Sequence, residues 1–144
     1  MRLASHAAGL RSKLIRVAPV AAAVIAADWV LKASASALDQ PVHLHWFHER
    51  QHAWRPVIVA IVLVMALGAI SRGRLAILGF GMVLGALLGN LLELAAFGRV
   101  TDFIPFPPGS VSAPADFFAF GGYVLFCIGM WGDLLRRKRA ARST

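Results

Sequence analysis

Residues 75–97 read LAILGFGMVLGALLGNLLELAAF and decide the class of this protein. Glu93 is the one charged residue of the stretch, which reaches the ~20 residues that an α-helix needs to cross a bilayer. Gly81, Gly85 and Gly89 recur every fourth residue and therefore share one helical face. A face of small residues lets a neighbouring helix approach closely. The stretch predicts a membrane-spanning helix packed tightly against another helix of the same chain.

Three further apolar stretches cover residues 14–38, 54–70 and 117–135. Of the 144 residues, 58% are hydrophobic, and the mean hydropathy is +0.68. Soluble domains of this size carry more charge and fewer apolar residues. The sequence therefore predicts an all-α membrane protein, a single domain over residues 1–144 with four transmembrane helices close to these bounds.

Basic residues cluster at three places. They precede the first apolar stretch (Arg2, Arg11, Lys13, Arg16), separate the second from the third (Arg72, Arg74) and follow the fourth (Arg136, Arg137, Lys138, Arg139, Arg142). Cytoplasmic flanks of membrane helices are rich in Lys and Arg, so this placement predicts both termini in the cytoplasm. The loops over residues 39–53 and 98–116 then face the outer side. The pattern also explains the net charge of +8 without nucleic acid as a partner.

Two pairs of polar residues lie within the apolar stretches. Asp28 and Lys32 are one helical turn apart, with the acid on the N-terminal side as an ion pair prefers. Their charges also favour a retained first helix over a cleaved signal peptide, whose core is normally uncharged. Asn90 and Glu93 share a face near the outer end of the third stretch. Because polar groups inside membranes pair with one another, we expect all four residues to support a site at the outer face.

Asp102 and Asp116 are the strongest candidates for chemistry. Asp102 lies in a partly apolar segment of the outer loop, and Asp116 stands at the head of the fourth helix, where a negative charge is stabilised. Two carboxyl groups in different environments that share one proton can activate a water to cut a peptide bond. The residues alone equally allow Asp116 as a helix N-cap and Asp102 as a turn residue.

A second pattern competes with this interpretation. The segment His48-Glu49-Arg50-Gln51-His52 matches H-E-x-x-H, in which two His bind zinc and the Glu acts as a base. Its loop is short and closed by Pro56, and the next acidic residue, Glu93, lies a whole span away. A zinc peptidase is therefore the lesser alternative, and we expect no metal or other cofactor.

Four motifs carry a resemblance to a known family. They are DWVLK at residues 28–32, LGALLGNLLE at 84–93, FGRVTDFI at 97–104 and AD at 115–116. In this order they resemble the D-x-x-x-K, G-A-L-G-N-L-x-D-R, G-x-V-x-D-F-I and F-N-x-A-D motifs of signal peptidase II, the lipoprotein signal peptidase. The resemblance covers nearly the whole chain, and the block from Gly89 to Ile104 is its most specific part.

The resemblance implies a function and assigns roles. Asp102 and Asp116 would be the catalytic pair of an aspartyl endopeptidase, and Asp28, Lys32 and Asn90 would be supporting residues of the site. We include Glu93 among the supporting residues because it shares a helical face with Asn90. The substrate would be a prolipoprotein cleaved just before a lipid-modified Cys, at the outer face of the bacterial cytoplasmic (inner) membrane. The expected partners are this substrate and membrane lipids, and the expected state is a monomer, with an accessory subunit of a membrane complex as the other possibility.

The chain also departs from the family pattern. Leu94 stands where the family has Arg, Ser112 and Ala113 replace F-N, and the N-x-G-A-A-F motif before the second helix is not visible. These positions concern substrate binding more than the catalytic pair, so the sequence indicates a divergent member. A non-catalytic membrane scaffold or accessory subunit of the same fold is the alternative.

Overall fold

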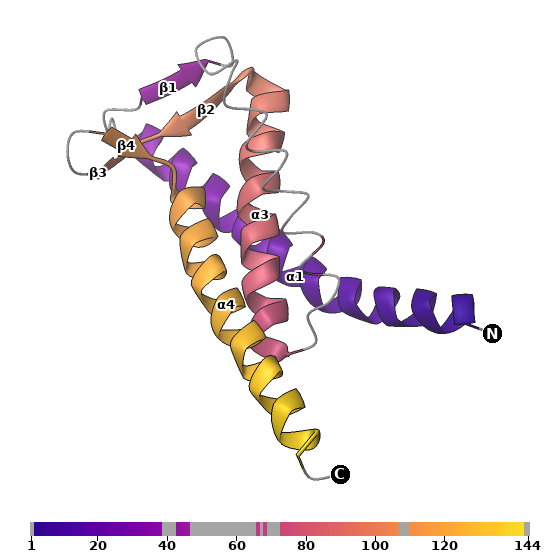
Figure 1. Cartoon of the computed structure of the whole chain (residues 1–144). Helices are drawn as coiled ribbons and strands as arrows, with labels where there is room; N and C mark the ends of the chain where they lie inside the picture. Colours follow the sequence, from indigo (N-terminus) through magenta and orange to yellow (C-terminus); the bar gives the residue numbers. More distant parts are fainter. Residues whose placement is uncertain are drawn as a thin grey trace.

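Three long helices dominate the computed structural model (Figure 1). The structure describes residues 2–38, 43–46, 66, 68, 73–106 and 110–142. Helix α1 spans Arg2–Ala37, α3 spans Arg74–Phe97 and α4 spans Pro114–Ala140. Each is long and apolar enough to cross a membrane, which confirms three of the predicted spans. The predicted span over residues 54–70 lies outside the described residues apart from Ala66 and Gly68, both helical.

The helix ends differ from the predicted bounds for local reasons. Helix α4 begins at Pro114 rather than residue 117, because Pro suits the first position of a helix. It continues to Ala140 because basic side chains favour the last turn of a helix. Helix α1 likewise begins at Arg2 rather than at residue 14, within the basic segment that precedes the apolar stretch.

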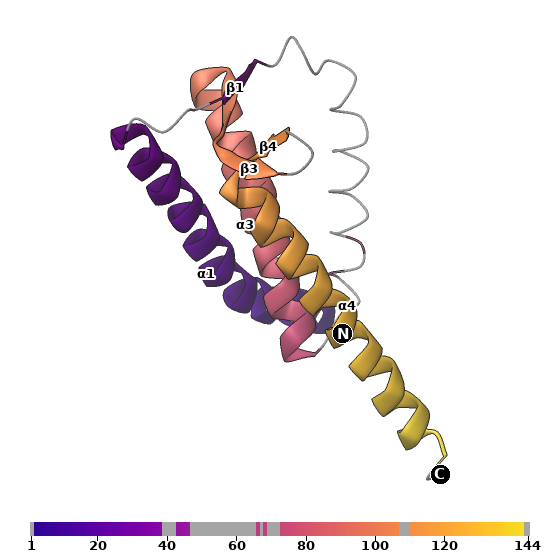
Figure 2. The same ribbon diagram turned by 90° about the vertical axis from the view of Figure 1, so that its left-hand side faces the viewer.

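Helix α3 lies at the centre, with α1 and α4 packed against it (Figure 2). The predicted glycine face contacts α1: a Cβ added at Gly85 would lie 2.6 Å from the carbonyl oxygen of Ala21. Toward α4, Gly79 approaches the backbone of Gly122, and Gly129 approaches Ala76. Small residues thus permit both close helix contacts, of which the sequence predicted the one made by the face of Gly81, Gly85 and Gly89.

The outward faces of the helices remain apolar. Large side chains such as Ile15, Phe120 and Trp131 are at least 65% exposed. Exposed apolar faces on helices of this length are suited to contact with lipid rather than water.

Short strands lie within the two predicted outer loops. Strand β1 (His43–Trp46) pairs antiparallel with β2 (Arg99–Asp102), and β3 (Ile104–Phe106) pairs with β4 (Ser110–Ser112). The segments predicted only as loops therefore contain paired strands, whose pairing satisfies backbone N–H and carbonyl groups. The strands gather beside the C-terminal end of α3 and the N-terminal end of α4 (Figure 1).

Candidate active site

A buried lysine lies at the centre of the site. The Lys32 Nζ atom is 2.8 Å from Asp28 Oδ2, 2.5 Å from Glu93 Oε2 and 3.0 Å from Asn90 Oδ1. The ion pair predicted from the spacing of Asp28 and Lys32 is therefore confirmed. The two helices α1 and α3 each supply two members, so all four predicted supporting residues meet in one cluster.

Burial makes this cluster energetically demanding. Asp28 is 0% exposed, and Lys32 and Glu93 are each 6% exposed. A charge removed from water is tolerated only when partners surround it. One ammonium group serves two carboxylates here, and the Asn90 amide oxygen completes its shell. A Cβ added at Gly89 would lie 3.5 Å from Asp28 Oδ2, an ordinary van der Waals distance, so the cluster packs directly against the glycine face of α3.

The remaining carboxylate oxygens bind backbone outside α1 and α3. Asp28 Oδ1 accepts a hydrogen bond of 2.9 Å from the N–H of Ala115, which directly precedes Asp116. Glu93 Oε1 accepts one of 3.1 Å from the N–H of Thr101, which directly precedes Asp102. A continuous polar chain therefore runs from the residue before one candidate catalytic Asp to the residue before the other.

The two candidates themselves occupy different surroundings. Asp102 ends β2 and is 4% exposed. Asp116 is exposed and is the third residue of α4. Its Oδ2 atom accepts a hydrogen bond of 3.2 Å from the N–H of Ala113, the residue that caps the helix. The N-cap alternative for Asp116 is thus wrong in position, because its side chain reaches back from the first turn as in a capping box.

A hairpin brings these two residues toward the same end. The N–H of Phe103 donates to the carbonyl of Ser112 at 3.3 Å, and Ile104 is the strand partner of Ser112. Asp102 is the residue before Phe103, while α4 starts two residues after Ser112. Asp102 and Pro114, the first residue of α4, therefore each lie two residues beyond the Ile104–Ser112 pair that this hairpin holds together.

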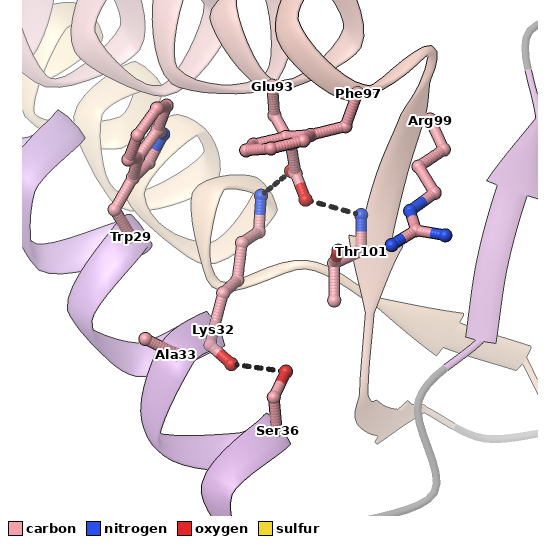
Figure 3. A pocket seen from close by; sticks show the side chains of 8 residues that line it. All are labelled: Trp29, Lys32, Ala33, Ser36, Glu93, Phe97, Arg99 and Thr101. Atoms are coloured by element: carbon pink, nitrogen blue, oxygen red, sulfur yellow. Dashed lines mark hydrogen bonds and ion pairs between the residues drawn. The ribbon is translucent and has the colours of Figure 1, made fainter.

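A pocket of about 280 Å³ opens beside the Lys32–Glu93 pair (Figure 3). The rings of Trp29 and Phe97, 6.4 Å apart, form an apolar wall. Arg99 supplies a guanidinium group, and Ser36 and Thr101 also line the space. Neither Asp102 nor Asp116 lines this pocket, so it meets the site through Lys32 and Glu93.

Sequence reasoning overlooked several of these features. It noted the absence of an Arg at Leu94 but not that Arg99 lines a pocket beside Glu93. It also missed the hydrogen bond from Ala115 to Asp28, because nothing in a local pattern connects residues 87 positions apart. The predicted H-E-x-x-H alternative (His48, Glu49, His52) lies outside the described residues.

Comparison with known families identifies the arrangement. Residues 20–132 match the family model described as signal peptidase (SPase) II. This chain belongs to the signal peptidase II family. The resemblance seen in the sequence motifs is thereby confirmed, and the matched region contains every residue of the Lys32 cluster as well as Asp102 and Asp116.

Individual signal peptidase II relatives match over part of their length. A lipoprotein signal peptidase from Maridesulfovibrio salexigens is 37% identical over 70 residues, which covers 43% of this chain and 45% of the relative. One from Burkholderia multivorans is 32% identical over 82 residues, covering 57% and 49%. The chain thus spans about half the length of the curated relatives that it matches.

The fold also has a counterpart among solved structures. A bacterial membrane enzyme superposes with a TM-score of 0.61 at 14% sequence identity, over 82% of this chain and 88% of that one. At this identity the match establishes the shared fold of the helical bundle.

Proposed function

We propose that this chain is a membrane aspartyl endopeptidase in which Asp102 and Asp116 are the catalytic residues. The observation that carries the proposal is the polar chain through Glu93, Lys32 and Asp28. At one end of this chain Glu93 binds the backbone N–H of the residue before Asp102, and at the other end Asp28 binds the backbone N–H of the residue before Asp116. Membership of the signal peptidase II family supports the same reaction class.

The proposed reaction is hydrolysis of one peptide bond by an activated water. One carboxylate accepts a proton from the water, whose oxygen attacks the scissile carbonyl carbon. The other carboxyl group donates a hydrogen bond to the carbonyl oxygen as negative charge develops there. The carbon–nitrogen bond then breaks, and a proton passes to the leaving amine. A pair of Asp residues sharing one proton is sufficient for these steps.

Asp28, Lys32, Asn90 and Glu93 act as positioning residues in this proposal. Asp28 and Glu93 contact the segments that carry Asp116 and Asp102 through backbone N–H groups rather than through the reacting carboxyl groups. Lys32 pairs with both of these carboxylates and donates a hydrogen bond to Asn90. Pre-set geometry matters because misplacement of a catalytic group by about 1 Å can cost ~10²-fold in rate.

The proposed substrate is a lipid-modified prolipoprotein cleaved at the outer face of the bacterial inner membrane. Relatives are named lipoprotein signal peptidases, and the long apolar helices of this chain suit a multi-pass membrane protein. We propose that it works as a monomer among membrane lipids.

A topology of four spans with both termini in the cytoplasm fits this proposal. The C-terminal ends of α1 and α3 meet in the Lys32 cluster, so the two helices run in the same direction. A chain that crosses a membrane twice in one direction must return between the two crossings. The apolar stretch over residues 54–70 is long enough to supply that return.

The test is cleavage of a diacylglyceryl-modified prolipoprotein by purified protein in lipid. Asp102→Asn and Asp116→Asn should each abolish cleavage while leaving the helical content unchanged. Asp133→Asn is the matched control, because Asp133 lies at the other end of α4, where it accepts a hydrogen bond from the N–H of Gly73. It should cleave at nearly the unmodified rate.

Three outcomes would overturn the assignment. Turnover near that of the unmodified protein in either Asp102→Asn or Asp116→Asn would show that the two residues are not a catalytic pair. Absence of cleavage by the folded, unmodified protein, with a stoichiometric partner in the preparation, would favour the scaffold alternative. Loss of activity on adding a zinc chelator would favour the zinc alternative.

A further inference from the structure

A second pocket lies between α1 and α3, at the end of the bundle away from the Lys32 cluster. Its volume is about 390 Å³, and its lining residues are Arg16, Val20, Arg74, Ile77 and Leu78. Arg16 is twelve residues before Asp28 on α1, which corresponds to ~18 Å along the helix. The pocket is therefore separate from the proposed peptidase site.

The polar part of this pocket is purely cationic. Arg16 and Arg74 are both exposed, and no carboxylate is among the lining residues. Asp133 accepts a hydrogen bond of 2.7 Å from the neighbouring N–H of Gly73 and forms an ion pair with Arg136 at 3.6 Å. Within the described part of the chain, neither Arg16 nor Arg74 forms an ion pair. Two guanidinium groups on separate helices at one opening attract an anion, and one that bridges them offsets their repulsion.

The apolar part of the pocket lies deeper along both helices. Val20 follows Arg16 by one turn of α1, and Ile77 and Leu78 follow Arg74 by one turn of α3. Both helices have membrane-spanning length, and Arg74 is the first residue of α3. The opening therefore places guanidinium groups at the end of the apolar span with a hydrophobic groove directly beside them.

We propose that this pocket binds the phosphate of an anionic phospholipid. Arg16 and Arg74 would hold the phosphate oxygens, which Arg recognises by paired N–H donors. An acyl chain would lie along Val20, Ile77 and Leu78. Basic pockets between membrane helices are a recurrent way to retain anionic headgroups. The occupant is an intact lipid rather than a free phosphate, because the apolar groove adjoins the cations.

The test measures lipid retained by the purified full chain. Protein is taken from nanodiscs of phosphatidylcholine with phosphatidylglycerol into mild detergent, and bound lipid is counted by native mass spectrometry. The unmodified protein should retain one phosphatidylglycerol in preference to phosphatidylcholine. Arg16→Gln and Arg74→Gln should each weaken retention by about fivefold, and the double variant by about 25-fold.

Controls separate this site from general attraction and from misfolding. Arg139→Gln removes an equal charge from the exposed end of α4 and should leave retention unchanged. The Arg16→Lys, Arg74→Lys double variant keeps both charges but not the paired donors, so its retention should lie between that of the unmodified protein and that of the Gln double variant. Equal retention by the unmodified protein and the Gln double variant would overturn the site. Displacement by soluble glycerol phosphate as effectively as by lipid would overturn the lipid as occupant.

Discussion

The Asp28 Oδ1 atom accepts a hydrogen bond of 2.9 Å from the backbone N–H of Ala115, 87 residues further along the chain. The other oxygen of the same carboxylate lies 2.8 Å from Lys32 Nζ. One fully buried side chain on α1 therefore fixes the first turn of α4 and neutralises the central lysine. The residue that it binds, Ala115, directly precedes Asp116, one of the two proposed catalytic residues.

Replacing Asp28 should reveal both of its contacts. Asp28→Ala leaves the Ala115 N–H without its acceptor and Lys32 with one carboxylate, so the free energy of unfolding should fall by about 3–5 kcal/mol. Asp28→Asn keeps an acceptor oxygen for Ala115 and should lose less. Denaturation in mild detergent, followed by helical circular dichroism, gives both values. Losses that are equal and under ~1 kcal/mol would contradict the role of this buried pair.

The cation at Lys32 should be coupled energetically to Glu93. Lys32→Met leaves two buried carboxylates without their shared cation, whereas the added change Glu93→Gln removes one of those charges. The double variant should therefore be more stable than the sum of the single losses implies, with a coupling of about 0.5–3 kcal/mol. The same unfolding assay on the four proteins of the cycle measures this coupling. Additive losses would show that the 2.5 Å contact carries little energy.

Shortening Glu93 should affect catalysis more than substrate binding. In the variant Glu93→Asp, the side chain is one methylene shorter and cannot reach both Lys32 Nζ and the Thr101 N–H. The segment before Asp102 should therefore shift. We expect kcat to fall by about 10²-fold with KM nearly unchanged. Ser34→Ala is the control, since Ser34 is exposed and donates only to its own helix at Val30. A rise in KM at constant kcat would instead make Glu93 a substrate-binding residue.

The glycine face of α3 yields a test of packing alone. At Gly85 an added Cβ would lie 2.6 Å from the Ala21 carbonyl oxygen, so Gly85→Ala should cost about 1–3 kcal/mol of stability. Gly121 on α4 has only the end of Met82 near its Cβ position, at 3.8 Å. Gly121→Ala should therefore be neutral or stabilising by up to about 1 kcal/mol. Similar melting temperatures for the two variants would show that α1 and α3 are not closely packed.

Local patterns predicted much of the fold because membrane helices are recognisable from composition. The spans near residues 14–38, 75–97 and 117–135 are helices, and the close approach expected from Gly81 and Gly85 is present. The pairing of β1 with β2 was not predicted, because strand partners 53 or more residues apart share no local signal. Helix ends were also misplaced, since a hydropathy pattern does not mark where capping residues such as Ala113 begin a helix.

By itself the sequence determined the membrane character, the Asp28–Lys32 ion pair and the family. These depend on apolar length, helical spacing and motif order, all of which are local. Only the tertiary structure decided that Lys32 meets Glu93 and Asn90, that Ala115 binds Asp28, and that two arginines line one pocket. Those contacts join separate helices, and they form because buried charges and backbone N–H groups must find partners wherever the folded chain brings them.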